Sequence, residues 1–178
     1  MRTRLGQNFL QNEHIALKIV EAAHITSDDI VVEIGPGRGI LTERILKKNP
    51  HKFIALELDK ELAGLLKKKF IGENSRSFII VNDDALTTDY EHLLYRHSSS
   101  CDNYSGEDHH QEVEKKRAIF IGNLPYCSAT AILKKLLPEN FWKRAVFMFQ
   151  KEVGDRILAM SDQRRNSATQ NLPRLKDI

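Results

Sequence analysis

The chain has 178 residues, of which 41% are hydrophobic and 29% charged, which predicts one globular domain with a hydrophobic core. Its net charge of +3 permits an RNA partner without requiring one. The sequence has no apolar run long enough to span a bilayer, and its first residues lack the apolar core of a signal peptide. Cys101 and Cys127 are too few for a disulfide framework. We therefore expect a soluble, cytoplasmic monomer with no membrane partner.

Apolar runs alternate with amphipathic stretches along the chain, as in α/β proteins with a parallel sheet. The predicted strands are 30–34, 53–58, 78–82, 118–122 and 145–149. The predicted helices are 12–24, 40–48, 60–70, 128–137 and 150–160, with Asn12 and Ser128 as caps of the first and fourth. The residues expected to face the sheet are Ile15, Ile19, Ala22 and Ala23 in the first helix and Leu62, Leu65, Leu66 and Phe70 in the third. This order predicts an α/β, Rossmann-like fold with a mostly parallel sheet and helices on both faces.

A glycine loop, Gly35-Pro36-Gly37-Arg38-Gly39, follows the first strand, as in nucleotide-binding βα units. Gly35 and Gly37 let a ligand approach the backbone closely. Pro36 removes an amide that a pyrophosphate would need, and Glu33 adds a nearby acid that would repel phosphate. S-adenosylmethionine lacks phosphate and carries a cationic sulfonium and ammonium. The loop therefore favours this methyl donor over NAD.

Carboxylates follow the next two predicted strands. Glu57 lies about twenty residues beyond the loop, where an acid can accept hydrogen bonds from both ribose hydroxyls of an adenosine. The alternative for Glu57 is a solvated carboxylate at a strand end. Asp83 and Asp84 follow the third strand at the same edge of the sheet, and one of them could accept a hydrogen bond from the adenine amino group of the cofactor.

The segment Asn123-Leu124-Pro125-Tyr126 follows the fourth predicted strand. The Asn123 amide oxygen and the Leu124 carbonyl can accept the two hydrogens of an exocyclic amine, while Tyr126 offers a stacking face. Pro125 restricts its own φ and holds Leu124 extended. An ordinary turn containing proline is the alternative. The residue types suit a target adenine, and we predict that all four residues act in catalysis.

Two polar segments differ in composition from the rest of the chain. Residues 96–117 are rich in Ser, Asp, Glu, His and Lys and predict a surface insertion within a domain of residues 1–160. Residues 161–178 have no apolar period and predict a tail. The histidines and cysteine in and beside the insertion match the spacing of no structural zinc site, so no metal is expected. These residues are His92, His97, Cys101, His109 and His110.

Six motifs occur in order: GQNFL at 6–10, VVEIGPGRGILT at 31–42, ALELD at 55–59, DAL at 84–86, NLPY at 123–126 and VFMFQKEV at 146–153. Together they resemble the motifs of the ribosomal RNA adenine dimethyltransferases of the kasugamycin-sensitivity methylase family. The resemblance implies a class I methyltransferase fold with S-adenosylmethionine as cofactor. It implies a cofactor site lined by Asn8, Leu10, Gly35, Glu57, Asp84 and Asn123. It also implies that the NLPY residues hold the target adenine.

The implied reaction places two methyl groups on each of two adjacent adenosines of small-subunit rRNA during ribosome maturation. The implied partner is therefore the immature small ribosomal subunit. Family members continue past the position of Met160 with further strands and a small helical domain, which residues 161–178 do not resemble. The fold is thus expected to be incomplete at its C-terminus, and the chain to bind cofactor better than it transfers methyl groups.

Three alternatives stay open at this point. The first is a truncated relative that binds cofactor or pre-ribosomal RNA without catalysis. The second is a large-subunit rRNA methylase of the erythromycin-resistance type, a group that more often has Ile where this chain has Leu124. The third is a nicotinamide-dependent oxidoreductase.

Overall fold

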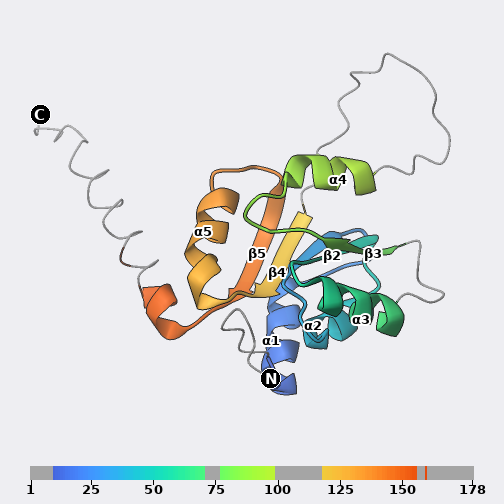
Figure 1. Cartoon of the computed structure of the whole chain (residues 1–178), viewed down its shortest axis with the longest axis horizontal. Helices are drawn as coiled ribbons and strands as arrows, with labels where there is room; N and C mark the ends of the chain where they lie inside the picture. Colours follow the sequence, from blue (N-terminus) through green and yellow to red (C-terminus); the bar gives the residue numbers. More distant parts are fainter. Residues whose placement is uncertain (1–9, 71–76, 99–117, 156–158, 160–178) are drawn as a thin grey trace, which may run out of the picture.

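The structure, a computed structural model, describes residues 10–70, 77–98, 118–155 and 159 (Figure 1). Asn8, residues 99–117 of the predicted insertion and the predicted tail at 161–178 lie outside the described residues. None of the described helices is long and apolar enough to cross a membrane.

One parallel sheet of five strands, in the order β3-β2-β1-β4-β5, organises the described residues (Figure 1). The strands are β1 (Ile30–Ile34), β2 (Lys52–Glu57), β3 (Phe78–Asn82), β4 (Ala118–Asn123) and β5 (Trp142–Met148). Every residue of β1 is buried, as expected for an apolar run at the centre of a parallel sheet. The strand order reverses beside β1, with β2 on one side and β4 on the other, and ligands of such sheets bind where this reversal occurs.

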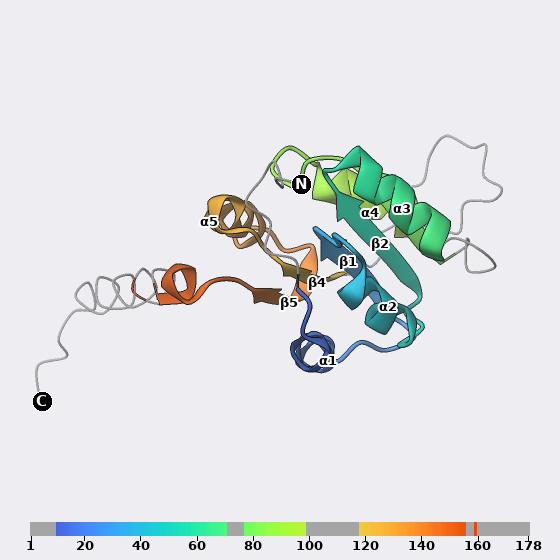
Figure 2. The same ribbon diagram turned by 60° about the horizontal axis from the view of Figure 1, so that its bottom comes forward.

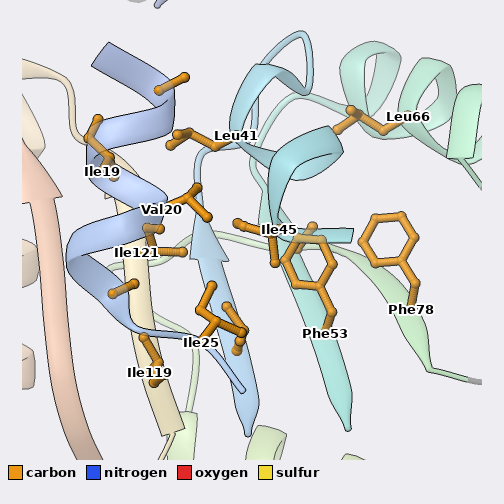
Figure 3. Close-up of a cluster of buried hydrophobic side chains, with 14 of the residues drawn as sticks. Ile19, Val20, Ile25, Leu41, Ile45, Phe53, Leu66, Phe78, Ile119 and Ile121 are labelled. Carbon is orange, nitrogen blue, oxygen red and sulfur yellow. The ribbon is translucent and has the colours of Figure 1, made fainter. Parts of the chain in front are cut away.

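Helices cover both faces of the sheet, as the sequence predicts. The helices are α1 (Glu13–Ala23), α2 (Ile40–Leu46), α3 (Lys60–Phe70), α4 (Tyr90–Ser98) and α5 (Tyr126–Leu136). The first three pack on one face and contribute to a core that includes Val20, Ile45 and Phe53 (Figure 3). The other two pack on the opposite face, around Phe120. In Figure 2, α1 and α5 lie on opposite sides of β4 and β5.

The predicted inward faces of two helices are partly wrong. Asn12 caps α1 as predicted, because its side chain accepts a hydrogen bond from the amide of Ile15. Ile15 and Ala22 are nevertheless exposed, and the buried residues of α1 are Ala16, Ile19, Val20 and Ala23. Ile19 and Ala23 are therefore buried as predicted, whereas Ala16 and Val20 are buried instead of Ile15 and Ala22. In α3, Leu65 is exposed while Ala63 and Leu66 are buried.

Two other helical predictions need correction. The fourth predicted helix begins at Tyr126, earlier than the expected cap Ser128, because the Pro125 carbonyl accepts hydrogen bonds from the amides of Ser128 and Ala129. Pro125 has the φ of −64° that suits the start of a helix. The helix α4 was not predicted, and its last turn contains residues 96–98, which the sequence assigned to the polar insertion.

The end of β4 approaches β1 too closely for any side chain at Gly122. Gly122 pairs with Ile34, and a Cβ at Gly122 would lie 2.5 Å from the Ile34 carbonyl oxygen. Asn123 follows directly, so this close approach sets the position of Asn123 beside the end of β1.

We predict that Gly122→Ala lowers the free energy of unfolding by about 1–3 kcal/mol, because the backbone of one strand must move. Urea denaturation measures this change. Gly64→Ala in α3 is the matched control, since a Cβ there would meet nothing within 4 Å. This control is expected to raise stability by about 0.5–1 kcal/mol. Equal effects of the two substitutions would contradict the steric explanation.

Candidate functional site

A cavity of about 470 Å³ lies at the edge of the sheet where the carboxyl ends of the strands meet. The cavity is lined by Leu10, Gln11, Asn12, Glu33, Gly35, Pro36, Gly37, Arg38, Ile40, Leu41, Glu57, Asn123, Leu124, Pro125, Met148, Phe149 and Gln150. These residues come from the segment before α1, from the end of β1, from the glycine loop and the first turn of α2, and from the ends of β2, β4 and β5. The cavity thus lies at the reversal of strand order, between the sequences after β1 and β4.

Most of the predicted site residues meet in this cavity. They are Leu10, Gly35, Gly37, Glu57, Asn123, Leu124 and Pro125. Asp84 follows β3 but is not part of the lining, and its carboxylate accepts a hydrogen bond of 2.8 Å from the Leu86 amide. Tyr126 begins α5, and its side chain, like all of Asn8, lies outside the described part of the structure.

The glycine loop turns sharply between β1 and α2. Gly35 and Gly37 have φ values of 68° and 57°, in the left-handed region that glycine adopts most readily. The Gly35 amide donates to the Leu56 carbonyl at 3.0 Å, and the Gly37 amide donates to the Glu57 carboxylate at 2.9 Å. Two hydrogen bonds therefore hold the glycine loop against the end of β2.

Glu57 is a buried structural group as well as a site residue. Its side chain is 2% exposed, which excludes the alternative of a solvated carboxylate. One carboxylate oxygen accepts from Gly37 and the other accepts from the Asp59 amide, also at 2.9 Å. Because an ionised carboxylate can accept about four hydrogen bonds, Glu57 retains capacity for a further donor at each oxygen.

Glu33 also lines the cavity, although it is fully buried. Its Oε2 atom accepts a hydrogen bond of 2.7 Å from the Thr42 hydroxyl, whereas Oε1 has no hydrogen-bond partner among the described residues. Burial raises the pKa of Glu33 to about 8; the Thr42 hydrogen bond opposes this shift and the charge of Glu57 adds to it. Burial therefore favours the protonated form of Glu33 in the unliganded cavity.

The segment after β4 is fixed by its neighbours on both sides. The Leu124 side chain is buried, and its amide donates to the Met148 carbonyl at the end of β5 at 2.9 Å. The Pro125 carbonyl is occupied by the first turn of α5. No residue in the described ranges donates a hydrogen bond to the Leu124 carbonyl. That carbonyl retains its capacity to accept a hydrogen bond.

Several lining residues were not predicted from the sequence. Met148 ends β5, Phe149 and Gln150 follow it, and Arg38 lies in the glycine loop. The first three could have been predicted from the sequence, because the carboxyl end of a fifth parallel strand must also lie at this edge of the sheet. Phe149 adds an aromatic ring to the side of the cavity that contains Leu124 and Pro125.

Within the described ranges, no three His, Cys, Asp or Glu side chains form a group that could hold a metal ion. Cys101, His109 and His110 of the predicted insertion lie outside these ranges.

The sequence profile described as ribosomal RNA adenine dimethylase matches residues 1–173. The chain belongs to this family. Ribosomal RNA small subunit methyltransferase A of Clostridium acetobutylicum is 39% identical over 157 residues, which cover 88% of this chain and 49% of that protein. The enzyme of the same name from Pelagibacter ubique is 41% identical over 159 residues, covering 87% and 51%. The chain thus spans about half the length of the curated relatives it matches.

Solved structures confirm the Rossmann-like class I methyltransferase fold. A dimethyladenosine transferase from Plasmodium falciparum matches with a TM-score of 0.63 and 30% identity, over 85% of this chain and 46% of that one. The 23S rRNA methyltransferase ErmE matches with a TM-score of 0.62 and 26% identity, over 82% and 49%. Because one fold serves both proteins, the fold by itself does not identify the RNA substrate.

Glu33 makes the stability of the unliganded chain depend on pH. Folding raises the pKa of the Glu33 carboxyl from 4.5 to about 8. The free energy of unfolding therefore falls as pH rises between these two values. We predict that Glu33→Gln, which keeps an acceptor for Thr42, removes this decline. Within this pH window, the free energy of unfolding of the variant should rise relative to that of wild type by about 1.4 kcal/mol for each pH unit.

Urea denaturation of both proteins across this pH range provides the measurement. Glu43→Gln is the control, because Glu43 is exposed and pairs with Lys47 on α2. A constant difference between Glu33→Gln and wild type over the window would contradict the protonated state of Glu33.

Proposed function

We propose that this chain is the catalytic part of an S-adenosylmethionine-dependent rRNA adenine dimethyltransferase. Its proposed substrate is a pair of adjacent adenosines in the small-subunit rRNA of an immature ribosomal subunit, modified in the cytoplasm by a monomeric enzyme. The observation that carries this proposal is the single cavity that joins the glycine loop and Glu57 to Asn123 and Leu124. Membership of the adenine dimethylase family supports the reaction, and the names of the curated relatives support the small-subunit substrate.

The lining residues fit the proposed cofactor. The Glu57 carboxylate suits a ligand with positive charge, and Pro36 offers no amide to a pyrophosphate. Glu57 would accept hydrogen bonds from the ribose hydroxyls. The proposed contacts also include Leu10, Gly35, Gly37 and Asn123 from the cavity, Asp84 from the neighbouring strand end, and Asn8 on the basis of the family resemblance. When bound, S-adenosylmethionine supplies a methyl group attached to a cationic sulfur.

The proposed catalytic role of the segment after β4 is to position and activate an amine. The exocyclic amine of adenine is a weak nucleophile, because its lone pair is delocalised into the ring. Hydrogen bonds from the amine to the Asn123 side chain and the Leu124 carbonyl return electron density to nitrogen and fix its direction of attack. The hydrogen bond from the Leu124 amide to the Met148 carbonyl and the geometry of Pro125 support this orientation. No strong general base is required for this step.

The target adenosine must be unpaired or turned out of its stack to reach the cavity. We assign the stacking role to Tyr126, the first residue of α5. Phe149 lines the same cavity and offers a second aromatic surface.

A large-subunit rRNA methylase is the second candidate, favoured by the structural match to the 23S rRNA methyltransferase ErmE. The curated relatives argue for the first candidate. They are 39% and 41% identical to this chain, compared with 26% for ErmE, and are named for the small subunit.

The first functional prediction concerns cofactor binding. Calorimetry should detect binding of S-adenosylmethionine and of its demethylated product, S-adenosylhomocysteine, but not of NAD. Glu57→Ala should weaken this binding by roughly 1.5–3 kcal/mol, because it removes a buried charged acceptor. Glu61→Ala is the control, since Glu61 is exposed on α3. Unchanged affinity of Glu57→Ala would show that the ribose assignment is wrong.

A second functional prediction separates chemistry from RNA capture. In a methyl-transfer assay with labelled donor and immature small subunits, Asn123→Ala should lower turnover at saturating RNA. Tyr126→Ala should instead raise the RNA concentration required, since stacking contributes roughly 1–3 kcal/mol per base. The assay includes this chain and a fusion to the C-terminal half of the Clostridium relative.

Two results would count against these assignments. Full turnover by Asn123→Ala would remove its side chain from the mechanism. Preferred transfer to large-subunit rRNA would replace the proposed substrate by that of the second candidate.

A further inference from the structure

Lys135, in the last turn of α5, connects that helix to the loop of residues 83–89 between β3 and α4. Its ammonium group donates hydrogen bonds to the carbonyls of Leu86 at 2.8 Å and Thr88 at 2.6 Å, which lie 49 and 47 residues away in the sequence. The same ammonium lies 5.1 Å from the centre of the Tyr90 ring at the start of α4. These three contacts of Lys135 all reach the segment from Leu86 to Tyr90.

The environment of Lys135 differs from that of an ordinary surface lysine. A surface lysine keeps its ammonium in water, because hydration stabilises the charge and fixing the long side chain costs entropy. Lys134, in the same turn, is exposed in this way, whereas Lys135 is half-buried. Two carbonyl oxygens and an aromatic face replace part of the hydration of the Lys135 ammonium.

Hydrogen bonds to its carbonyls fix the backbone of the 83–89 loop. The Thr88 hydroxyl donates to the Asp84 carbonyl at 2.8 Å, and the Tyr90 hydroxyl donates to the Ala85 carbonyl, also at 2.8 Å. Lys135 supplies the donors for two further carbonyls of the loop. The first two donors belong to the loop and to the adjoining α4, so among these bonds it is Lys135 that fixes the loop relative to α5.

The contact made by Lys135 is one residue pair away from the Asp84 carboxylate. One oxygen of that carboxylate, Oδ1, accepts a hydrogen bond of 2.8 Å from the Leu86 amide. The carbonyl of the same Leu86 accepts from Lys135. Leu86 is thus held by Asp84 on its amide side and by Lys135 on its carbonyl side. The direction of the Asp84 carboxylate therefore depends on where Lys135 holds the loop.

We propose that Lys135 is a positioning residue for the adenine of the cofactor. It holds the 83–89 loop so that the Asp84 carboxylate can accept a hydrogen bond from the adenine amino group. Because α5 begins at Tyr126, one helix then carries the segment that holds the target base at its first turn and fixes the loop for the cofactor's adenine at its last turn. This inference rests on the proposed function, since it takes S-adenosylmethionine as the ligand and Asp84 as its contact.

A residue that acts through Asp84 should affect only the ligands that Asp84 distinguishes. S-adenosylhomocysteine has an amino group that can donate to the Asp84 carboxylate. S-inosylhomocysteine is the same molecule with a carbonyl oxygen in place of that amino group, so it presents an acceptor to the carboxylate. The ratio of the two dissociation constants therefore measures the Asp84 contact. Both constants are measured on the same protein, so a variant's loss of folded protein does not change their ratio.

Calorimetry with the two ligands measures this ratio for wild type and for variants. Wild type should bind S-adenosylhomocysteine about tenfold more tightly than S-inosylhomocysteine. Lys135→Met keeps most of the side-chain length but removes the charge and the donors. It should weaken binding of S-adenosylhomocysteine by about fivefold and that of S-inosylhomocysteine by less than about twofold, so that the ratio falls. Lys135→Gln, a polar neutral replacement, carries the same expectation if Lys135→Met does not fold.

Two controls separate positioning from a general effect on the structure. Lys134→Met removes the exposed charge next to Lys135 and should keep the wild-type ratio. Asp84→Ala removes the acceptor and should lower the ratio by itself. Adding Lys135→Met to Asp84→Ala should then lower the ratio no further, because the two residues act on the same contact.

Each outcome supports or overturns the positioning role. A wild-type ratio in a folded neutral variant of Lys135 would overturn it and leave the cofactor assignment intact. An equal fall in Lys134→Met, or a further fall on adding Lys135→Met to Asp84→Ala, would also overturn it. No preference of wild type for S-adenosylhomocysteine would overturn the Asp84 contact and the positioning role together. Failure of wild type to bind either ligand would overturn the cofactor assignment as well.

Discussion

The hydrogen bond from the Gly37 amide to the Glu57 carboxylate is the interaction on which the site depends most directly. It joins the loop after β1 to the end of β2, and the Asp59 amide holds the second oxygen of the same carboxylate. Gly37 can make this contact because it adopts a φ of 57°. The loop is thereby shaped before any ligand arrives, so a ligand meets a preorganised backbone and the entropic cost of ordering the loop is reduced.

Two acids at adjacent strand ends have different properties because their surroundings differ. Glu57 accepts hydrogen bonds from two backbone amides, those of Gly37 and Asp59. Glu33 faces one hydroxyl and the charge of Glu57, and burial favours its neutral form. Burial is the main cause of the raised pKa of Glu33, and the hydrogen bond from Thr42 only partly opposes it.

The parts of the structure that were predictable from the sequence depend on short-range patterns. The buried runs at 30–34 and 78–82 gave strands with the observed bounds, and the common edge of a parallel sheet placed Glu57 and Asn123 together. The face of α1 was not predictable from its periodicity, because apolar residues surround most of that helix and only packing against the sheet selects Ala16 over Ile15. The helix α4 was missed because it is stabilised by distant contacts, such as that of Tyr90 with Phe120. The protonation of Glu33 follows from burial, which the sequence does not reveal.

The pairing of Gly122 with Ile34 joins segments that lie far apart in the chain. The strands β1, β2 and β3 follow one another in the chain and can form their glycine loop and Glu57 contact from nearby sequence. Strand β4 must then return from far along the chain to the free side of β1, and closing so long a loop costs entropy that no local contact offsets beforehand. The part of the cavity that contains Glu33 and Glu57 therefore depends on contacts closer in sequence than the part that contains Asn123.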